Sequence, residues 1–69
     1  MNNNVEQLRK EMKTSQEDLA KACNVSRQTI ISIEKGKYSP SIQLAFKLAR
    51  YFNKQIEDVF IYDENEDNN

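Results

Sequence analysis

The segment that most constrains the fold of this chain is QEDLAKACNVSRQTIISIEK, from Gln16 to Lys35. It contains two short apolar patterns with helical spacing, separated by only a few residues. Asn24 lies between them, and Asn reaches the left-handed conformation of a tight turn more readily than most residues other than Gly. Ser26 then caps a second helix that opens with Arg27 and Gln28. The positions expected to face inward are Leu19, Ala20, Cys23, Val25, Ile30 and Ile33.

This spacing is typical of a helix-turn-helix, in which the second helix is presented to the major groove of DNA. Ser15 and Asp18 resemble a capping box at the start of the first of the two helices. We expect that helix to end near Cys23. The second should end near Lys35, because Gly36 is a common helix terminator.

The length of 69 residues allows one domain, close to the lower limit for a stable single core. A chain this short needs well-packed helices or a partner subunit. One Gly and one Pro leave a composition that favours helices. No apolar run is long enough to span a membrane, and the start MNNNVEQLRK lacks the hydrophobic stretch of a signal peptide. We therefore expect a cytoplasmic protein without a membrane partner.

The net charge of −1 argues at first against a nucleic-acid partner. However, four acidic residues lie in the last seven, DENEDNN, and the rest of the chain has ten basic and seven acidic residues. We predict a single domain over residues 1–62 and an acidic, disordered tail over residues 63–69. A regulatory role for the tail, such as mimicry of DNA, stays open as an alternative.

Three further helices complete an expected all-α fold, a compact five-helix bundle. The first covers Val5 to Met12, with apolar residues three to four positions apart. The fourth is expected to begin with Ser39 as its cap and Pro40 in its first turn, and a short fifth covers 56–59. The fourth should run to Phe52 and bury Ile42, Ala45, Leu48, Ala49 and Phe52. The β-branched and aromatic segment VFIYDE either forms a short strand that pairs with the start MNNNV, or does not pair.

The motifs LRKEM, TSQEDLAKACNVSRQTIISIEKGKYSPS and LAFKLARYF…IEDVF resemble the phage-repressor-like, or Xre, family of small helix-turn-helix regulators, over residues 6–60. The chain departs from the family pattern at Asn24, where glycine is usual, at Cys23, often a larger aliphatic, and at Ile31, often polar. The resemblance implies a transcriptional regulator, which we interpret as a repressor. It also implies a homodimer on a pseudo-palindromic site in double-stranded DNA, with half-sites about 34–36 Å apart.

The resemblance places Arg27, Gln28 and Ser32 at positions that face base edges. The chemistry agrees, because Arg can bind guanine O6 and N7 with two bonds, and Gln can bind adenine N6 and N7. Ile31 lies one turn beyond Arg27 and packs either on a thymine methyl group or on its own neighbours. The alternatives for the other three are a phosphate contact or surface ion pair for Arg27 and plain exposure for Gln28 and Ser32.

Other positions are expected to contact phosphates or to support the fold. Gln16 starts a helix whose free N–H groups favour an anion. The full set of expected phosphate contacts is Gln16, Thr29, Lys35, Lys37 and Tyr38; the alternative is solvated lysines, with Tyr38 packed on the bundle. The family pattern also implies a structural ion pair between Arg9 and Glu34.

Several apolar residues have no obvious intramolecular contact in this scheme. They are Leu44, Phe46, Tyr51, Ile61 and Tyr62. A small domain that exposes such a patch usually buries it in a partner, by default a second copy related by two-fold symmetry. The alternative is that part of this set completes the domain core.

The sequence offers little for catalysis. It contains no His, no glycine-rich phosphate loop and no metal-ligand cluster, and Cys23 has no basic partner nearby in sequence. We therefore predict neither an enzyme nor a bound cofactor or metal. The rival to a DNA-binding regulator is a protein-interaction module, such as an antitoxin or anti-regulator bound to a regulatory protein partner.

Overall fold

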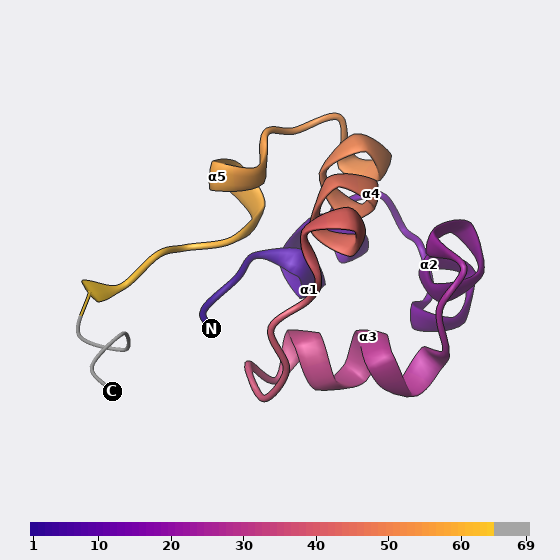
Figure 1. Cartoon of the computed structure of the whole chain (residues 1–69). Coiled ribbons are helices and arrows are strands. Elements are labelled where there is room, and N and C mark those ends of the chain that lie inside the picture. Colours follow the sequence, from indigo (N-terminus) through magenta and orange to yellow (C-terminus); the bar gives the residue numbers. More distant parts are fainter. Residues whose placement is uncertain (65–69) are drawn as a thin grey trace.

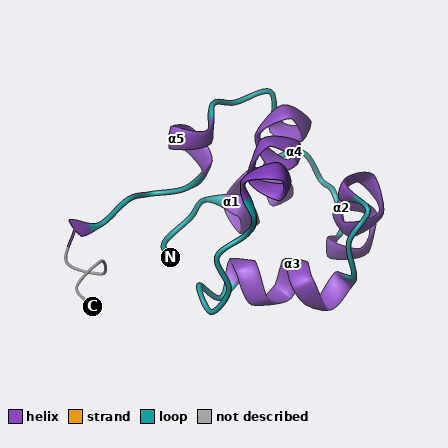
Figure 2. Ribbon diagram, in the orientation of Figure 1, coloured by secondary structure: helices purple, strands orange, loops and turns teal. Residues whose placement is uncertain are grey.

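The computed structural model describes residues 1–64, which form the expected all-α bundle (Figures 1 and 2). Its helices are α1 (Val5–Glu11), α2 (Gln16–Cys23), α3 (Arg27–Glu34), α4 (Ile42–Phe52) and α5 (Ile56–Val59). Helix α3 contacts α2 and α1, and α4 contacts α1, α2 and α5. In Figure 1, α3 lies along the lower edge of the molecule and α2 lies beside its start. The predicted helix-turn-helix is therefore confirmed. Residues 65–69, most of the predicted acidic tail, lie outside the described residues.

Serine residues are the N-caps of three of these helices. The Oγ atoms of Ser15, Ser26 and Ser41 each accept a hydrogen bond from the backbone N–H three residues later, at 3.0–3.1 Å. Such caps satisfy amides that have no partner within the helix. The prediction that Ser39 caps the fourth helix was wrong. Ser41 has an extended backbone and binds the Leu44 amide, so α4 starts two residues after Pro40 rather than on it.

Tight turns end α2 and α4 with asparagine in the left-handed conformation. Asn24 has φ 59° and ψ 44°, and the next residue, Val25, donates its N–H to Ala20 O at 3.0 Å. Asn53 has the same geometry at the end of α4. The role of Asn24 in the turn is therefore confirmed, and its amide side chain makes the positive φ tolerable without glycine.

The core is built from one face of each helix. Its fully buried side chains are Val5, Leu19, Cys23, Ile30, Ile33, Leu48 and Val59. The inward positions predicted for α2 and α3 are thus correct, and Val25 packs half-buried against them. Burial raises the pKa of the Cys23 thiol, which therefore fills the core as a neutral group.

The predicted core face of α4 needs one correction. Ile42 is 71% exposed, whereas Leu44, which had been expected on the surface, is only 6% exposed. The buried stripe repeats every four residues from Leu44 and Ala45 to Phe52. Ile42 is the first residue of α4 and falls beside this stripe.

The two ends of the described chain meet in one short antiparallel contact. Asn3 and Phe60 form an isolated β-bridge. On either side of it, Asn4 N–H donates to Val59 O at 2.8 Å and Ile61 N–H donates to Asn2 O at 2.9 Å. The pairing left open by the sequence therefore exists, but only as a single bridge. None of the helices within residues 1–64 is long and apolar enough to cross a bilayer.

Candidate nucleic-acid interface

The outward face of α3 presents polar side chains with no intramolecular role. Arg27 and Gln28 are exposed in the first turn of the helix, directly after the Ser26 cap. Within residues 1–64, neither side chain takes part in a hydrogen bond or an ion pair. Ile31 and Ser32 follow on the helix and are half-buried. Long, unengaged donors at the start of an exposed helix have the chemistry that base edges in a major groove require.

A shallow hollow of about 210 Å³ adjoins this face. It is lined by Ser26, Gln28, Thr29, Ser32 and Tyr38, so it brings two predicted base-reading residues together with two predicted phosphate contacts. The Thr29 hydroxyl lies 2.9 Å from Ser26 Oγ, so it already has one partner within the cap. Tyr38 is 46% exposed and therefore is not packed away on the bundle.

Basic residues follow α3 in a turn closed by its own backbone. Gly36, with φ 75°, donates its N–H to Ile33 O at 2.9 Å, and Lys37 N–H donates to Ser32 O at 3.0 Å. Lys35 and Lys37 are exposed. This turn places both lysines beyond the end of α3, next to Tyr38. We call residues 35–38 the α3 turn.

The Arg9–Glu34 ion pair implied by the resemblance is present and largely buried. Arg9 Nε lies 2.8 Å from Glu34 Oε2, and the two side chains are 11% and 4% exposed. Arg9 also donates to Thr14 O at 3.0 Å. These bonds fix α3 to α1 and to the loop that precedes α2.

Gln16 joins the same network, which the sequence did not predict. Its Nε2 donates to Glu34 Oε1 at 3.0 Å, and the side chain is half-buried. A Gln amide has a second N–H. Gln16 therefore keeps one donor beyond its bond to Glu34, at the start of α2.

The predicted dimer residues divide into two groups. Leu44 lies in the core, and the Tyr51 hydroxyl lies 3.1 Å from Thr14 Oγ1 while its ring packs edge-on against Phe52. The expectation that Leu44 and Tyr51 lack an intramolecular contact was wrong, because the face of α4 that carries them packs against α1 and α2. Phe46, Ile61 and Tyr62 are 51%, 44% and 65% exposed.

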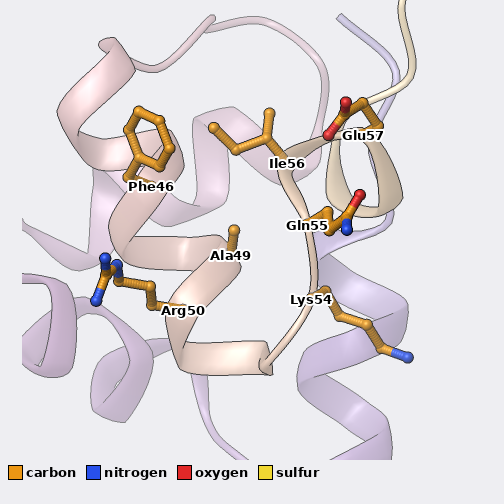
Figure 3. A pocket seen from close by; sticks show the side chains of 7 residues that line it. All are labelled: Phe46, Ala49, Arg50, Lys54, Gln55, Ile56 and Glu57. Atoms are coloured by element: carbon orange, nitrogen blue, oxygen red, sulfur yellow. The ribbon is translucent and has the colours of Figure 1, made fainter.

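A groove between α4 and α5 adds residues to this exposed apolar surface. Its volume is about 630 Å³, and its lining consists of Phe46, Ala49, Arg50, Lys54, Gln55, Ile56 and Glu57. Figure 3 shows Phe46 and Ile56 on either side of the opening, with Ala49 below them. Neither Ile42 nor Ile56 was predicted for this surface. Ile42 was assigned to the core, and Ile56 was assigned only to the start of the fifth helix. Within residues 1–64, no ion pair involves Arg50, Lys54 or Glu57.

Comparisons with known proteins agree with this geometry. The sequence profile of the helix-turn-helix family matches residues 5–59. An uncharacterized HTH-type transcriptional regulator of Methanocaldococcus jannaschii is 65% identical over 52 residues, 75% of this chain and 79% of the relative. Another such regulator, YgzD of Bacillus subtilis, is 45% identical over 64 residues, 93% and 97% of the two chains.

Solved structures show the same fold. A transcriptional regulator from Listeria innocua superposes with a TM-score of 0.76 at 25% identity, over 91% of this chain. The clp gene regulator ClgR from Corynebacterium glutamicum superposes with a TM-score of 0.73 at 20% identity, over 78% of this chain. The chain spans 64% and 57% of these two proteins, respectively.

Proposed function

This chain belongs to the helix-turn-helix family of DNA-binding transcriptional regulators, which are not enzymes, and from that premise we propose that it is a homodimeric repressor of transcription. Its target is a short pseudo-palindromic operator in double-stranded DNA, and it acts in the cytoplasm. Repression needs only occupancy of the operator.

The observation that carries this proposal is the outward face of α3. Arg27 and Gln28 are exposed and unengaged, so neither has to break an internal bond in order to meet a base. We assign them to guanine and adenine edges, respectively. Ser32 and Ile31 lie further along the same helix and complete the reading face. Ile31 is half-buried, so only part of it is available to a thymine methyl group.

Contacts to phosphates flank this face in the proposal. Gln16 offers its second amide N–H beside the N-terminus of α2, whose free backbone amides also favour an anion. The α3 turn, which directly follows the Glu34 to which Gln16 is bonded, offers Lys35, Lys37 and Tyr38. Thr29 lines the hollow that Tyr38 also lines. Such contacts provide affinity and salt dependence but little sequence preference.

We place the homodimer interface on the exposed apolar surface of α4, α5 and the C-terminal segment. The apolar members are Ile42, Phe46, Ile56, Ile61 and Tyr62. Arg50 and Glu57 lie on opposite sides of Ala49 in the groove (Figure 3). A two-fold axis that passes between them would set each Arg50 against Glu57 of the partner subunit, so the surface is complementary to itself.

Selection of bound duplexes from a random DNA pool tests the DNA part of the proposal. We expect enrichment of sites with two inverted half-sites, spaced by about one helical turn. If the folded protein enriched no duplex, the proposal would be overturned, and the protein-interaction module would be favoured instead.

The dimer is tested separately by sedimentation velocity. Phe46→Asp should shift the protein to monomer, whereas Ala22→Asp, an equal charge change on an exposed position of α2, should not. Arg50→Glu should weaken the dimer, and Arg50→Glu combined with Glu57→Arg should restore it. Equal sedimentation of the Phe46→Asp and Ala22→Asp proteins would remove this surface from the interface.

A further inference from the structure

The side chain of Asn3 joins segments that lie far apart in the sequence. Its Nδ2 donates to Ile33 O at 2.8 Å, in the last turn of α3, and also to Met1 O at 3.1 Å. Its Oδ1 accepts the N–H of Val5, the first residue of α1, at 3.1 Å. The Asn3 backbone forms the bridge to Phe60. One half-buried amide thus connects the end of α3, the start of α1 and the C-terminal segment.

The bond to Ile33 reaches the point at which the α3 turn begins. Carbonyls in the last turn of a helix have no partner within the helix. Ile33 O accepts the Gly36 N–H at 2.9 Å in addition to Asn3 Nδ2. Asn3 therefore holds the carbonyl from which the chain turns toward Lys35 and Lys37.

The neighbouring asparagines, Asn2 and Asn4, bond the N-terminal segment to the C-terminal part of the described chain. Asn2 O accepts the Ile61 N–H at 2.9 Å, and Asn4 Nδ2 donates to Asp58 O at 3.1 Å. Asn4 makes no bond to α3. Of the three consecutive asparagines, Asn3 is the one whose side chain reaches the recognition helix.

We propose that Asn3 is a positioning residue for DNA binding: it fixes the α3 turn, and through it the lysines that contact the DNA backbone, relative to the C-terminal segment. This inference rests on the proposed function, because it takes Lys37 as a phosphate contact. The amide is required because it supplies a donor and an acceptor from one short side chain, whereas a carboxylate only accepts.

The test compares Asn3→Asp with Asn4→Asp, which introduces the same charge one residue away. Asn3→Asp keeps an acceptor for the Val5 N–H but loses the donor to Ile33 O, and it sets a negative charge at the unfavourable end of the α3 dipole. Affinity for the selected duplex is measured well below both unfolding temperatures. We expect a loss of about fivefold for Asn3→Asp, the size of one hydrogen bond, and less than about twofold for Asn4→Asp.

A double-mutant cycle with Lys37→Ala separates positioning from a general loss of structure. In the Asn3→Asp protein, Lys37→Ala should reduce affinity and salt dependence less than it does in the unaltered protein. The base preference in the selection should stay the same, because Arg27 and Gln28 lie at the other end of α3.

An NMR titration of the unaltered protein tests the same proposal without relying on the variants to fold. The side-chain amide resonances of Asn3 should shift on addition of the duplex, and those of Asn4 should not. Equal affinity losses for the two variants, or equal shifts of the two amides, would overturn the role of Asn3 alone. An unaltered protein that binds no duplex would overturn the proposed function as well.

Discussion

The two sides of α3 differ in what their residues are bonded to. On the inner side, Ile30 and Ile33 are fully buried, and Glu34 is bonded to Arg9 and Gln16. On the outer side, Arg27 and Gln28 are exposed and make no bond within the described residues. One eight-residue helix thus has an inner face bonded into the fold and an outer face that, in the proposed function, reads DNA. Substitutions on the inner side should lower the free energy of unfolding, and those on the outer side should change DNA binding alone.

The largest effect is expected when Glu34, on the inner side of α3, loses its partner Arg9 of α1. Arg9→Met leaves the buried Glu34 carboxylate without its cation, and this should reduce the free energy of unfolding by about 3–5 kcal/mol. Urea denaturation at low temperature measures it. The matched control is Arg9→Met combined with Glu34→Leu, which removes both charges and should recover most of the loss. A loss below about 1 kcal/mol for the single variant would show that the pair behaves as a surface pair.

Gln28→Ala tests the outer side. It should reduce discrimination at one base position of each half-site by about 1–3 kcal/mol and leave the unfolding midpoint unchanged. Competition binding with single-base variants of the selected duplex provides the measurement, and Lys47→Ala, on an exposed position of α4, provides the control. A shift in thermal unfolding with no change in base preference would reverse the assignment of this face.

The Ser26 cap supports both faces, because it fixes the start of the helix. Ser26→Ala should lower the free energy of unfolding by about 1 kcal/mol, the usual effect of a lost N-cap. Ser39→Ala is the control, since Ser39 is exposed and makes no capping bond in the described structure. Equal denaturation midpoints for the two variants would contradict the cap geometry.

The smallest effect is expected in the α3 turn. Lys37→Ala should weaken binding to all duplexes to a similar extent and reduce the slope of log affinity against log salt by about 1. Fluorescence anisotropy at several salt concentrations gives the slope. If the slope stayed unchanged while base preference shifted, Lys37 would belong with the base-reading residues instead.

The helix-turn-helix could be predicted from the sequence because its signals are local. Ser15, Asn24 and Ser26 act on residues one to five positions away, and the apolar spacing of α2 and α3 indicates a single inward face. In α4 the same reasoning was ambiguous, because two serines flank Pro40. Apolar residues of α4 also occupy two neighbouring faces. Ile42 was therefore predicted in the core and Leu44 on the surface, whereas the structure has the reverse.

The bonds that link distant segments could not be predicted. Gln16 and Glu34 are 18 residues apart, and Asn3 and Ile33 are 30 apart, and no periodic pattern connects such positions. The Arg9–Glu34 pair was expected only because the chain resembles a family in which it occurs. Asn3 carries no signal of its own in the run MNNNV. Its proposed role depends on the bridge that brings the two ends of the described chain together.

Mapping the DNA-contacting surface by NMR shows whether the outer face of α3 binds DNA. A ¹⁵N-labelled sample is titrated with the selected duplex, and amide and side-chain shifts are followed residue by residue. We expect the largest changes at the outer face of α3, at the start of α2 and in the α3 turn, with the groove between α4 and α5 unaffected. Changes concentrated in that groove, with Arg27 and Gln28 unperturbed, would contradict this expectation.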